Sequence, residues 1–494
     1  MSRSSCPREP LLMKRQIIPD HNSPSAKKAC TGSTFHASPV PCRQQGSLLT
    51  LPQEVLELII TFAAHDYSDT CGGREYYFSY RTVADLAIVC RRLYGIATPI
   101  LYRSISLGDI QPSELHRTLQ TNPRLRQYCR ILFLDASTIP TSSWTDFDVV
   151  GDIVSWLTRV KKLNIFCPYH CTRDGKVDYV GSLWDTVVKA TQHMHELESL
   201  ECIGLGFMWV LGSVQSRSVS MLTIRNGGGD RRNVKMPVNT SQESSVTEIS
   251  LYGCRETPED MAQLLQWPKA LSSFHMGCFN VDLDGVKYSY SMFETWLRKH
   301  QTTLRSLTMC GLPGDNVDER AFNASAFPHL ESLRLSRWNM GTKLWLSDTD
   351  ADELLGPSLK TFTWDFRKLA DQKGSWMDFG EEEENWIRAF ARAAVERKAA
   401  LKSIRIAFSS FDRGQGTIGY PWGRMARVRD EFEPDGLIVT WDTPVLIGED
   451  WPDASPQCVY AVESLYEVVT HDDCPSPGEM EILMREAHLP GMMA

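Results

Sequence analysis

The chain is organised around residues 51–107, which read LPQEVLELIITFAAHDYSDTCGGREYYFSYRTVADLAIVCRRLYGIATPILYRSISL. Apolar residues in the first part recur at the spacing of one helix face. Pro52 suits the first turn of that helix, and Glu54 lies where the helix dipole favours an acid. A second apolar face of helical period spans residues 83–93, and Pro99 is expected to end that helix. The segment is predicted to form a compact trio of short helices, too small to bury much apolar surface alone.

This segment resembles an F-box, in particular the form found in large fungal families. The resemblance rests on the Leu-Pro start, the apolar helix face that follows it, and the Cys-Arg-Arg-Leu sequence at residues 90–93. It implies docking through desolvated apolar side chains onto the small adaptor subunit of an SCF-type cullin–RING ubiquitin ligase, and through the adaptor onto a cullin. The residues that it assigns to adaptor docking are Leu51, Pro52, Val55, Leu56, Ile59, Leu86, Val89 and Leu93.

One departure from the F-box pattern lies at residues 65–80, where the spacer between the two helical faces is longer than usual. Gly72 and Gly73, with nearby Asp and Ser residues, predict a loop there. This loop either projects harmlessly, since a surface insertion costs little closure entropy, or obstructs the adaptor. The alternative interpretation of the whole segment is an ordinary helical hairpin in a globular core.

The composition is that of a globular protein with an acidic balance. The chain has 494 residues, of which 42% are hydrophobic and 23% charged, and its net charge is −9. This balance argues against a nucleic-acid-binding surface, which would show a basic excess. No apolar run is long enough to span a membrane, and no signal-peptide core is found. The fourteen scattered cysteines are therefore expected to be reduced thiols of a cytoplasmic or nuclear protein.

The two ends of the chain are compositionally distinct from the rest. Residues 1–46 are rich in Ser, Pro, Lys and Arg and are predicted to be a disordered basic tail. Two basic pairs, at positions 14–15 and 27–28, fit either a bipartite nuclear import signal or a generic basic tail. Residues 446–494 are rich in Asp, Pro and Glu and are predicted to form a C-terminal cap or tail.

Residues 108–445 repeat a pattern of apolar residues at i, i+3 and i+5. Leucine-rich repeats show this pattern, because alternate residues of a short strand point into the core. Chance alone supplies about a dozen bare matches, so the pattern is weak without a further feature. The ten instances begin at Tyr128, Val160, Leu197, Val219, Val246, Leu271, Leu304, Leu330, Leu359 and Leu401.

A Ser or Thr at i+2 sharpens the pattern, because chance would supply it in only about two instances. Six instances have it, at Ser199, Ser273, Ser306, Ser332, Thr361 and Ser403. The segments between are predicted to be helical, with Thr257 as an N-cap, a capping box from Ser291 to Glu294, and a long helix at residues 381–400.

Strands that alternate with helices predict an α/β protein. We expect the F-box-like domain, residues 47–107, to precede an irregular leucine-rich-repeat solenoid, or horseshoe, over residues 108–445. The repeats start 22 to 42 residues apart, which makes the horseshoe irregular. The arrangement resembles the C-terminal regions of fungal F-box proteins, and a non-repetitive α/β domain is the alternative.

No motif predicts catalysis, since the sequence has no Walker-type loop, HExxH, GxSxG or GxGxxG. We therefore expect a protein that is not an enzyme, with no cofactor and no metal site. Two functions stay open: a ligase subunit that holds a protein target on its repeats, and an interaction scaffold that never joins a ligase. Exposed strand side chains of mixed sign favour a protein partner over DNA or RNA, unless they form only a solvated face. Those assigned to target binding are Glu201, Arg305, Arg334, Lys360 and Arg405.

Overall fold

The computed structural model describes residues 50–66, 77–108, 111–135, 144–167, 187–189, 191–204, 210, 218–225, 244–253, 256–277, 288–312, 321–340, 344–367, 378–408 and 421–442. The chain divides into two compact units, and the second begins at Pro52 and contains every element described below. The predicted basic tail, the middle of the predicted insertion and the predicted C-terminal cap lie outside the described residues.

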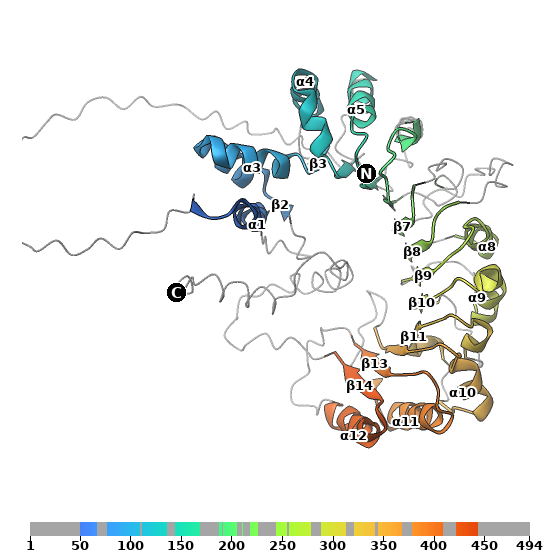
Figure 1. The fold of residues 1–494 in the computed structure, drawn as a ribbon. Coiled ribbons are helices and arrows are strands. Elements are labelled where there is room, and N and C mark those ends of the chain that lie inside the picture. The colour runs from blue at the N-terminus through green and yellow to red at the C-terminus, as the bar shows by residue number, and fades with distance from the viewer. Residues whose placement is uncertain are drawn as a thin grey trace, which may run out of the picture. The chain divides into compact units, whose positions relative to one another are not determined.

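Twelve parallel strands form one sheet in the described chain, and they follow one another in chain order (Figure 1). Neighbouring strands pair residue by residue, so that equivalent positions form rows across the sheet. Parallel neighbours need a crossover between them, which the helices provide where they are described. The strands are β3 Ser104–Ser106, β4 Ile131–Asp135, β5 Lys162–Phe166, β6 Ser199–Ile203, β7 Met221–Arg225, β8 Glu248–Tyr252, β9 Ser273–Met276, β10 Ser306–Met309, β11 Ser332–Ser336, β12 Thr361–Asp365, β13 Ser403–Ala407 and β14 Ile438–Trp441.

In the described part of the chain, seven α-helices pack their apolar sides against one face of this sheet (Figure 1). They are α4 Pro112–Thr121, α5 Trp144–Trp156, α8 Pro258–Gln266, α9 Tyr290–Leu297, α10 Asp348–Leu354, α11 Glu381–Glu396 and α12 Trp422–Phe432. Three further helices precede β3 and pack on one another: α1 Gln53–Ala64, α2 Tyr80–Val89 and α3 Arg91–Leu101. We call the face of the sheet opposite the seven helices the open face, because no described helix covers it.

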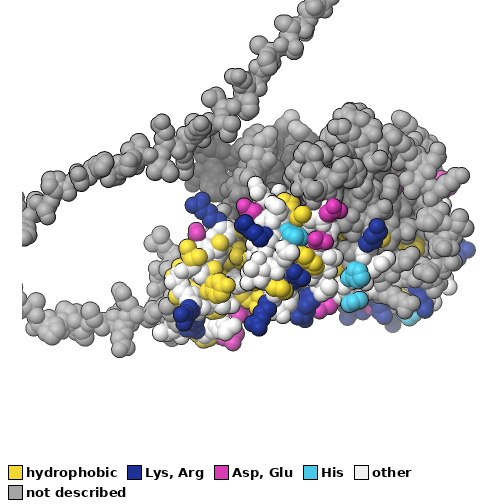
Figure 2. All heavy atoms as spheres, turned by 90° about the horizontal axis from the view of Figure 1, so that it is seen from above, with side chains coloured by type: hydrophobic (Ala, Val, Ile, Leu, Met, Phe, Trp, Pro, Cys, Tyr) yellow, Lys and Arg dark blue, Asp and Glu magenta, His cyan; other side chains and the backbone are white. Residues whose placement is uncertain are grey.

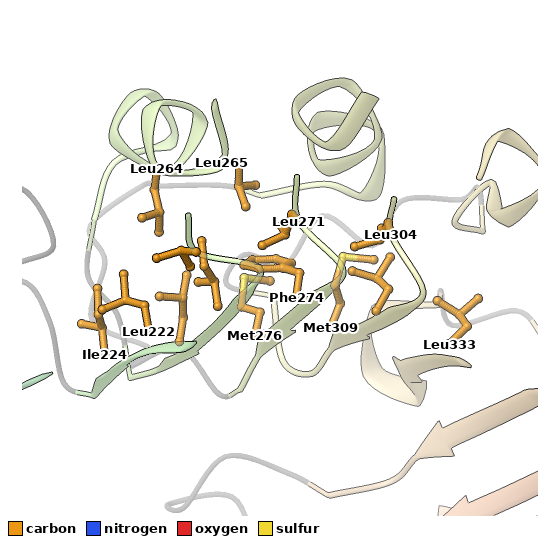
Figure 3. Packing of buried hydrophobic residues seen from close by; sticks show 14 of the residues in the cluster. Leu222, Ile224, Leu264, Leu265, Leu271, Phe274, Met276, Leu304, Met309 and Leu333 are labelled. Carbon is orange, nitrogen blue, oxygen red and sulfur yellow. The ribbon is translucent and has the colours of Figure 1, made fainter. Parts of the chain in front are cut away.

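The core lies between the sheet and the seven helices. Successive strand residues point to opposite faces, so alternate residues enter this core. In β6, Leu200 and Cys202 are 1% and 0% exposed, whereas Glu201 between them is only partly buried. Figure 3 shows the same arrangement around α8, where Leu264 and Leu265 lie over apolar side chains of neighbouring strands.

The α/β class is confirmed, but the predicted architecture is wrong. Among the described residues there is no separate small helical domain followed by a leucine-rich-repeat solenoid: one compact unit contains the helices and a twelve-stranded all-parallel sheet. The Tyr80 hydroxyl of α2 donates to the Ser104 carbonyl of β3 and accepts from Ser106 N–H, both at 3.0 Å. The helices thereby join the edge of the sheet. The apolar pattern did not distinguish the two architectures, because every parallel strand with one covered face has it.

The strand register agrees with the sequence pattern except at β4. In the nine later instances the residues at i+3 and i+5 are buried. At β4 the pattern predicts that Ile131 and Phe133 are buried, but the buried residues are Leu132 and Leu134, and Phe133 is 38% exposed. A shift of one residue exchanges the two faces of a strand.

The break between α2 and α3 also differs from the prediction. Cys90 is extended, with φ −159° and ψ 165°, and its Sγ accepts from Leu93 N–H at 3.5 Å. The apolar face at residues 83–93, which was predicted for one helix, is therefore divided between α2 and α3. Pro99 lies inside α3 rather than at its end, because Tyr102 N–H still bonds to the Thr98 carbonyl at 3.2 Å.

Candidate protein-binding interfaces

Helix α1 has apolar side chains on two faces. Its inner face is buried against α2 and α3 and consists of Leu56, Ile60 and Ala64. Its outer face is 36% to 51% exposed and consists of Val55, Leu58, Ile59 and Phe62, at i, i+3, i+4 and i+7. A helix whose apolar residues extend beyond one face normally has both apolar faces covered. The outer face of α1 is therefore suited to bind another protein.

Helices α2 and α3 add to this surface. Ile88 and Val89, in the last turn of α2, are 83% and 65% exposed, and Tyr94 of α3 is 58% exposed. Seven of the eleven exposed large hydrophobic side chains in the described chain thus lie on α1, α2 and α3. We call these seven residues the helical apolar surface. Figure 2 shows apolar side chains gathered on the end of the molecule that holds these helices, at the left of the view.

Charged side chains flank the helical apolar surface with opposite signs on different helices. Glu54 and Glu57 are exposed on α1, whereas Arg91 and Arg92 are exposed at the start of α3. Segregated charges of this kind favour one orientation of a partner over others.

The residues assigned to adaptor docking fall into three groups of exposure. Pro52, Val55, Ile59 and Val89 are exposed, Leu51 and Leu86 are partly buried, and Leu56 and Leu93 are buried at 0% and 4% exposure. The last two hold the helices together. Sequence reasoning missed the exposed residues Leu58, Phe62, Ile88 and Tyr94, although the two apolar faces of α1 were visible in the spacing.

The residues assigned to target binding lie in two places on the sheet. Glu201, Arg334 and Arg405 belong to one row of the open face, in which Thr363 separates the two arginines. Arg305 and Lys360 instead lie directly before β10 and β12, at the amino ends of these strands. The sequence pattern did not separate these positions, because both fall outside the i, i+3 and i+5 core residues.

All five of these residues form ion pairs within the chain. Glu201 accepts from Arg225 at 2.7 Å, and Arg405 contacts Asp442 at 2.7 Å. Glu331 pairs with both Arg305, at 2.9 Å, and Lys360, at 2.6 Å. The hydrogen bond and charge of Lys360 lower the pKa of Glu331, so this carboxylate stays ionised at neutral pH.

Arg334 contacts the completely buried carboxylate of Asp365 at 2.9 Å. Burial alone would raise the pKa of Asp365, but the guanidinium groups of Arg367 and Arg334 outweigh burial and hold its pKa well below the usual range. Cys310 Sγ donates to the same carboxylate at 3.1 Å. Burial and the charge of Asp365 raise the pKa of the Cys310 thiol far above its ordinary value, so the thiol is a hydrogen-bond donor and not a nucleophile.

Within the described ranges, no group of three or more His, Cys, Asp and Glu side chains is arranged to hold a metal ion. None of the described helices has the length and apolar character needed to cross a membrane. Comparison of the sequence with protein-family models gave no match, and comparison with curated proteins gave none either. The surfaces described above are therefore the basis for a functional proposal.

Proposed function

We propose that this protein is a substrate-recognition subunit of an SCF-type cullin–RING ubiquitin ligase. Helices α1, α2 and α3 dock on the adaptor subunit, and the open face of the sheet holds a protein target. The observation that carries this proposal is the exposed outer face of α1, because it lies in the segment that resembles an F-box. The protein performs no chemistry itself, since proximity of the target to the ubiquitin-carrying subunit supplies the rate enhancement.

The outer face of α1 has enough apolar area to contribute to a stable complex. Val55 and Ile59 are 36% and 37% exposed, and Leu58 and Phe62 are 51% and 43% exposed. Completing the burial of each side chain contributes on the order of 1 kcal/mol, because a full burial of such a residue is worth roughly 1.5–3 kcal/mol. The docking residues that we propose are Pro52, Val55, Leu58, Ile59, Phe62, Ile88, Val89 and Tyr94.

The insertion between α1 and α2 begins and ends in a short pair of strands, which we call the stem. Strands β1 His65–Asp66 and β2 Tyr77–Phe78 pair antiparallel between the end of α1 and the start of α2. Val55 precedes the stem by ten residues, or roughly 15 Å along a helix. The first turns of the α1 outer face therefore lie at the end of the helix away from this stem, which favours docking at that end.

A cytoplasmic or nuclear location is part of this proposal. The five cysteines of the described residues, Cys90, Cys129, Cys167, Cys202 and Cys310, are free thiols. Free thiols fit a reducing compartment, where cullin–RING ligases would meet the protein.

The test is a pull-down of the full chain by the purified adaptor. The Ile59→Asp, Phe62→Asp double variant places two charges on the outer face of α1 and is expected to lose binding. The matched control is Phe133→Asp, Phe166→Asp, which changes side chains of similar exposure, 38% and 40%, on the sheet. This control is expected to bind like the native chain. Failure of the native chain to bind would refute the ligase function and leave the interaction scaffold as the better hypothesis.

A further inference from the structure

The strands and the residues that flank them differ in charge between two parts of the sheet. On β10–β14 Arg334 and Arg405 are matched by Asp365 and Asp442, whereas at the amino ends Arg305, Lys360 and Lys402 outnumber Glu331. The strand segments of β10–β14, at residues 305–310, 331–337, 360–367, 402–408 and 437–442, contain seven basic and three acidic residues, a surplus of four positive charges. The segments of β3–β9, at residues 103–108, 130–135, 161–167, 198–204, 220–225, 247–253 and 272–277, contain five basic and four acidic residues. The whole chain has a net charge of −9, so β10–β14 oppose the sign of the molecule.

Two arginines of β10–β14 are held in place by their own carboxylates. Arg334 contacts Asp365 through Nε and Nη2, and Arg405 contacts Asp442 through the same two atoms. Each guanidinium has five N–H donors, so Nη1 of both arginines keeps donors for a further acceptor. The aspartates thus orient the arginines without using all their hydrogen-bonding capacity.

Hydroxyl groups surround these arginines on the same strands. Thr363 lies between Arg334 and Arg405 in one row, and the adjacent row is Ser332, Thr361 and Ser403. On β10–β14 the only exposed large hydrophobic side chain among the described residues is Ile438. Guanidinium and hydroxyl donors suit a carboxylate ligand, because both can donate to its oxygens.

We propose that strands β10–β14 bind an acidic segment of a partner protein, rich in Asp and Glu, across their amino ends and the adjoining open face. Lys360 and Lys402, which directly precede β12 and β13, extend the basic surface to the amino ends of the strands. The paired arginines favour carboxylates, which guanidinium groups bind with matching geometry, and the assay below compares the peptide with a nucleic acid directly. The inference rests on the proposed function only in naming the partner as a ubiquitylation target, since the binding itself needs no adaptor.

The test is fluorescence anisotropy with the full chain and a labelled synthetic peptide in which Glu and Asp alternate with Gly and Ser. The variant Lys360→Gln, Lys402→Gln, Arg405→Gln removes three exposed charges and is expected to weaken binding about tenfold. The control Arg117→Gln, Arg159→Gln, Lys269→Gln removes three exposed charges elsewhere and is expected to bind like the native chain.

Three results would overturn the proposal: no binding of the acidic peptide by the native chain, equal binding of the Gln and Asn version of the peptide, or equal losses in the two variants. Tighter binding of single-stranded DNA of the same charge would also overturn it, in favour of a nucleic-acid partner. No adaptor is present in this assay, so its outcome is independent of the pull-down that tests the proposed function. Equal thermal midpoints of the two variants are the check that both are folded.

Discussion

The helices α1–α3 and the strands β10–β14 expose opposite kinds of side chain. On the helices, apolar residues such as Phe62 and Ile88 face outward with 43% and 83% exposure. Among the described residues of these strands Ile438 is the only exposed large apolar side chain, and the outward charges of Arg334 and Arg405 already have partners in Asp365 and Asp442. The difference indicates two modes of binding: burial of apolar area on the helices, which salt affects little, and charge recognition on the strands, which salt screens.

The largest effect on stability is expected from a substitution that removes the buried carboxylate of β12. Asp365→Asn leaves the guanidinium groups of Arg334 and Arg367 without their shared, completely buried carboxylate. We expect the free energy of unfolding to fall by about 3–5 kcal/mol, because breaking a buried pair leaves uncompensated charge. Urea unfolding of the full chain measures this loss.

The control is Asp442→Asn, since the Asp442 side chain is 27% exposed. Its pair with Arg405 is expected to contribute only about 0.2–1 kcal/mol. Equal losses in the two variants would show that burial does not distinguish these pairs.

The second prediction sharpens the contrast between the two faces of α1. Leu56→Ala, at 0% exposure, is expected to lower the free energy of unfolding by about 2–5 kcal/mol, because it opens a cavity among the helices. Leu58→Ala, at 51% exposure, is expected to cost less than about 1 kcal/mol in stability but to weaken adaptor binding. Thermal unfolding and adaptor titration of both variants separate the roles. A large stability loss for Leu58→Ala would contradict the assignment of an outer face.

The third prediction concerns the pH dependence of stability that a buried histidine of the core produces. His300 is buried; its Nδ1 accepts from Leu271 N–H at 3.2 Å, and its Nε2 lies 2.7 Å from the Leu265 carbonyl. Burial lowers the pKa of His300 below 6.5, so the unfolded chain takes up this proton at a higher pH than the folded chain. Stability that is present above pH 6.5 is therefore expected to fall as the pH drops through the folded-state pKa.

Urea unfolding at pH 7 and pH 5.5 measures that slope. His300→Gln is expected to lower stability by about 1–3 kcal/mol at pH 7, because a buried backbone group loses its partner, and to have a smaller slope. An unchanged slope in this variant would assign the acid sensitivity to other groups.

The smallest expected effect separates the two binding modes by salt. Raising NaCl shortens the range of exposed charge interactions, from about 10 Å at 0.1 M to about 3 Å at 1 M. Binding of the acidic peptide is expected to weaken several-fold over this range, whereas adaptor binding is expected to change by less than about twofold. Equal salt dependence would mean that both surfaces bind through charge.

The strands were largely predictable because each has one buried face, which makes the apolar alternation strong. Strand β4 was not, because its sequence Ile131-Leu132-Phe133-Leu134 is apolar on both faces and leaves the register open. Strand β3 was missed, since three residues are too few for a periodic signal. The architecture failed for a different reason: local spacing does not reveal whether helices and strands join in one unit.

Helix starts were predictable only where the capping interaction is local. Thr257 is the N-cap of α8, as predicted, and its hydroxyl accepts from Asp260 N–H at 3.2 Å; the structure adds the reciprocal bond that makes this a capping box. The predicted box from Ser291 to Glu294 is wrong, because Ser289 caps α9 and Glu294 instead accepts from the distant Asn323 N–H at 2.7 Å. Likewise, the spacing in α1 revealed its apolar residues, but only tertiary packing determined that Leu56 is buried and Leu58 is not.

The most direct test of the central claim is hydroxyl-radical footprinting of the full chain with and without the purified adaptor. Oxidation reports the exposure of individual side chains, so it reads the helical apolar surface residue by residue. Bound adaptor is expected to protect Phe62 and Tyr94, which are 43% and 58% exposed, and to leave Phe133 and Phe166 of the sheet unchanged. Adaptor binding without protection of Phe62 and Tyr94, or with protection of Phe133 and Phe166 instead, would contradict docking through α1–α3.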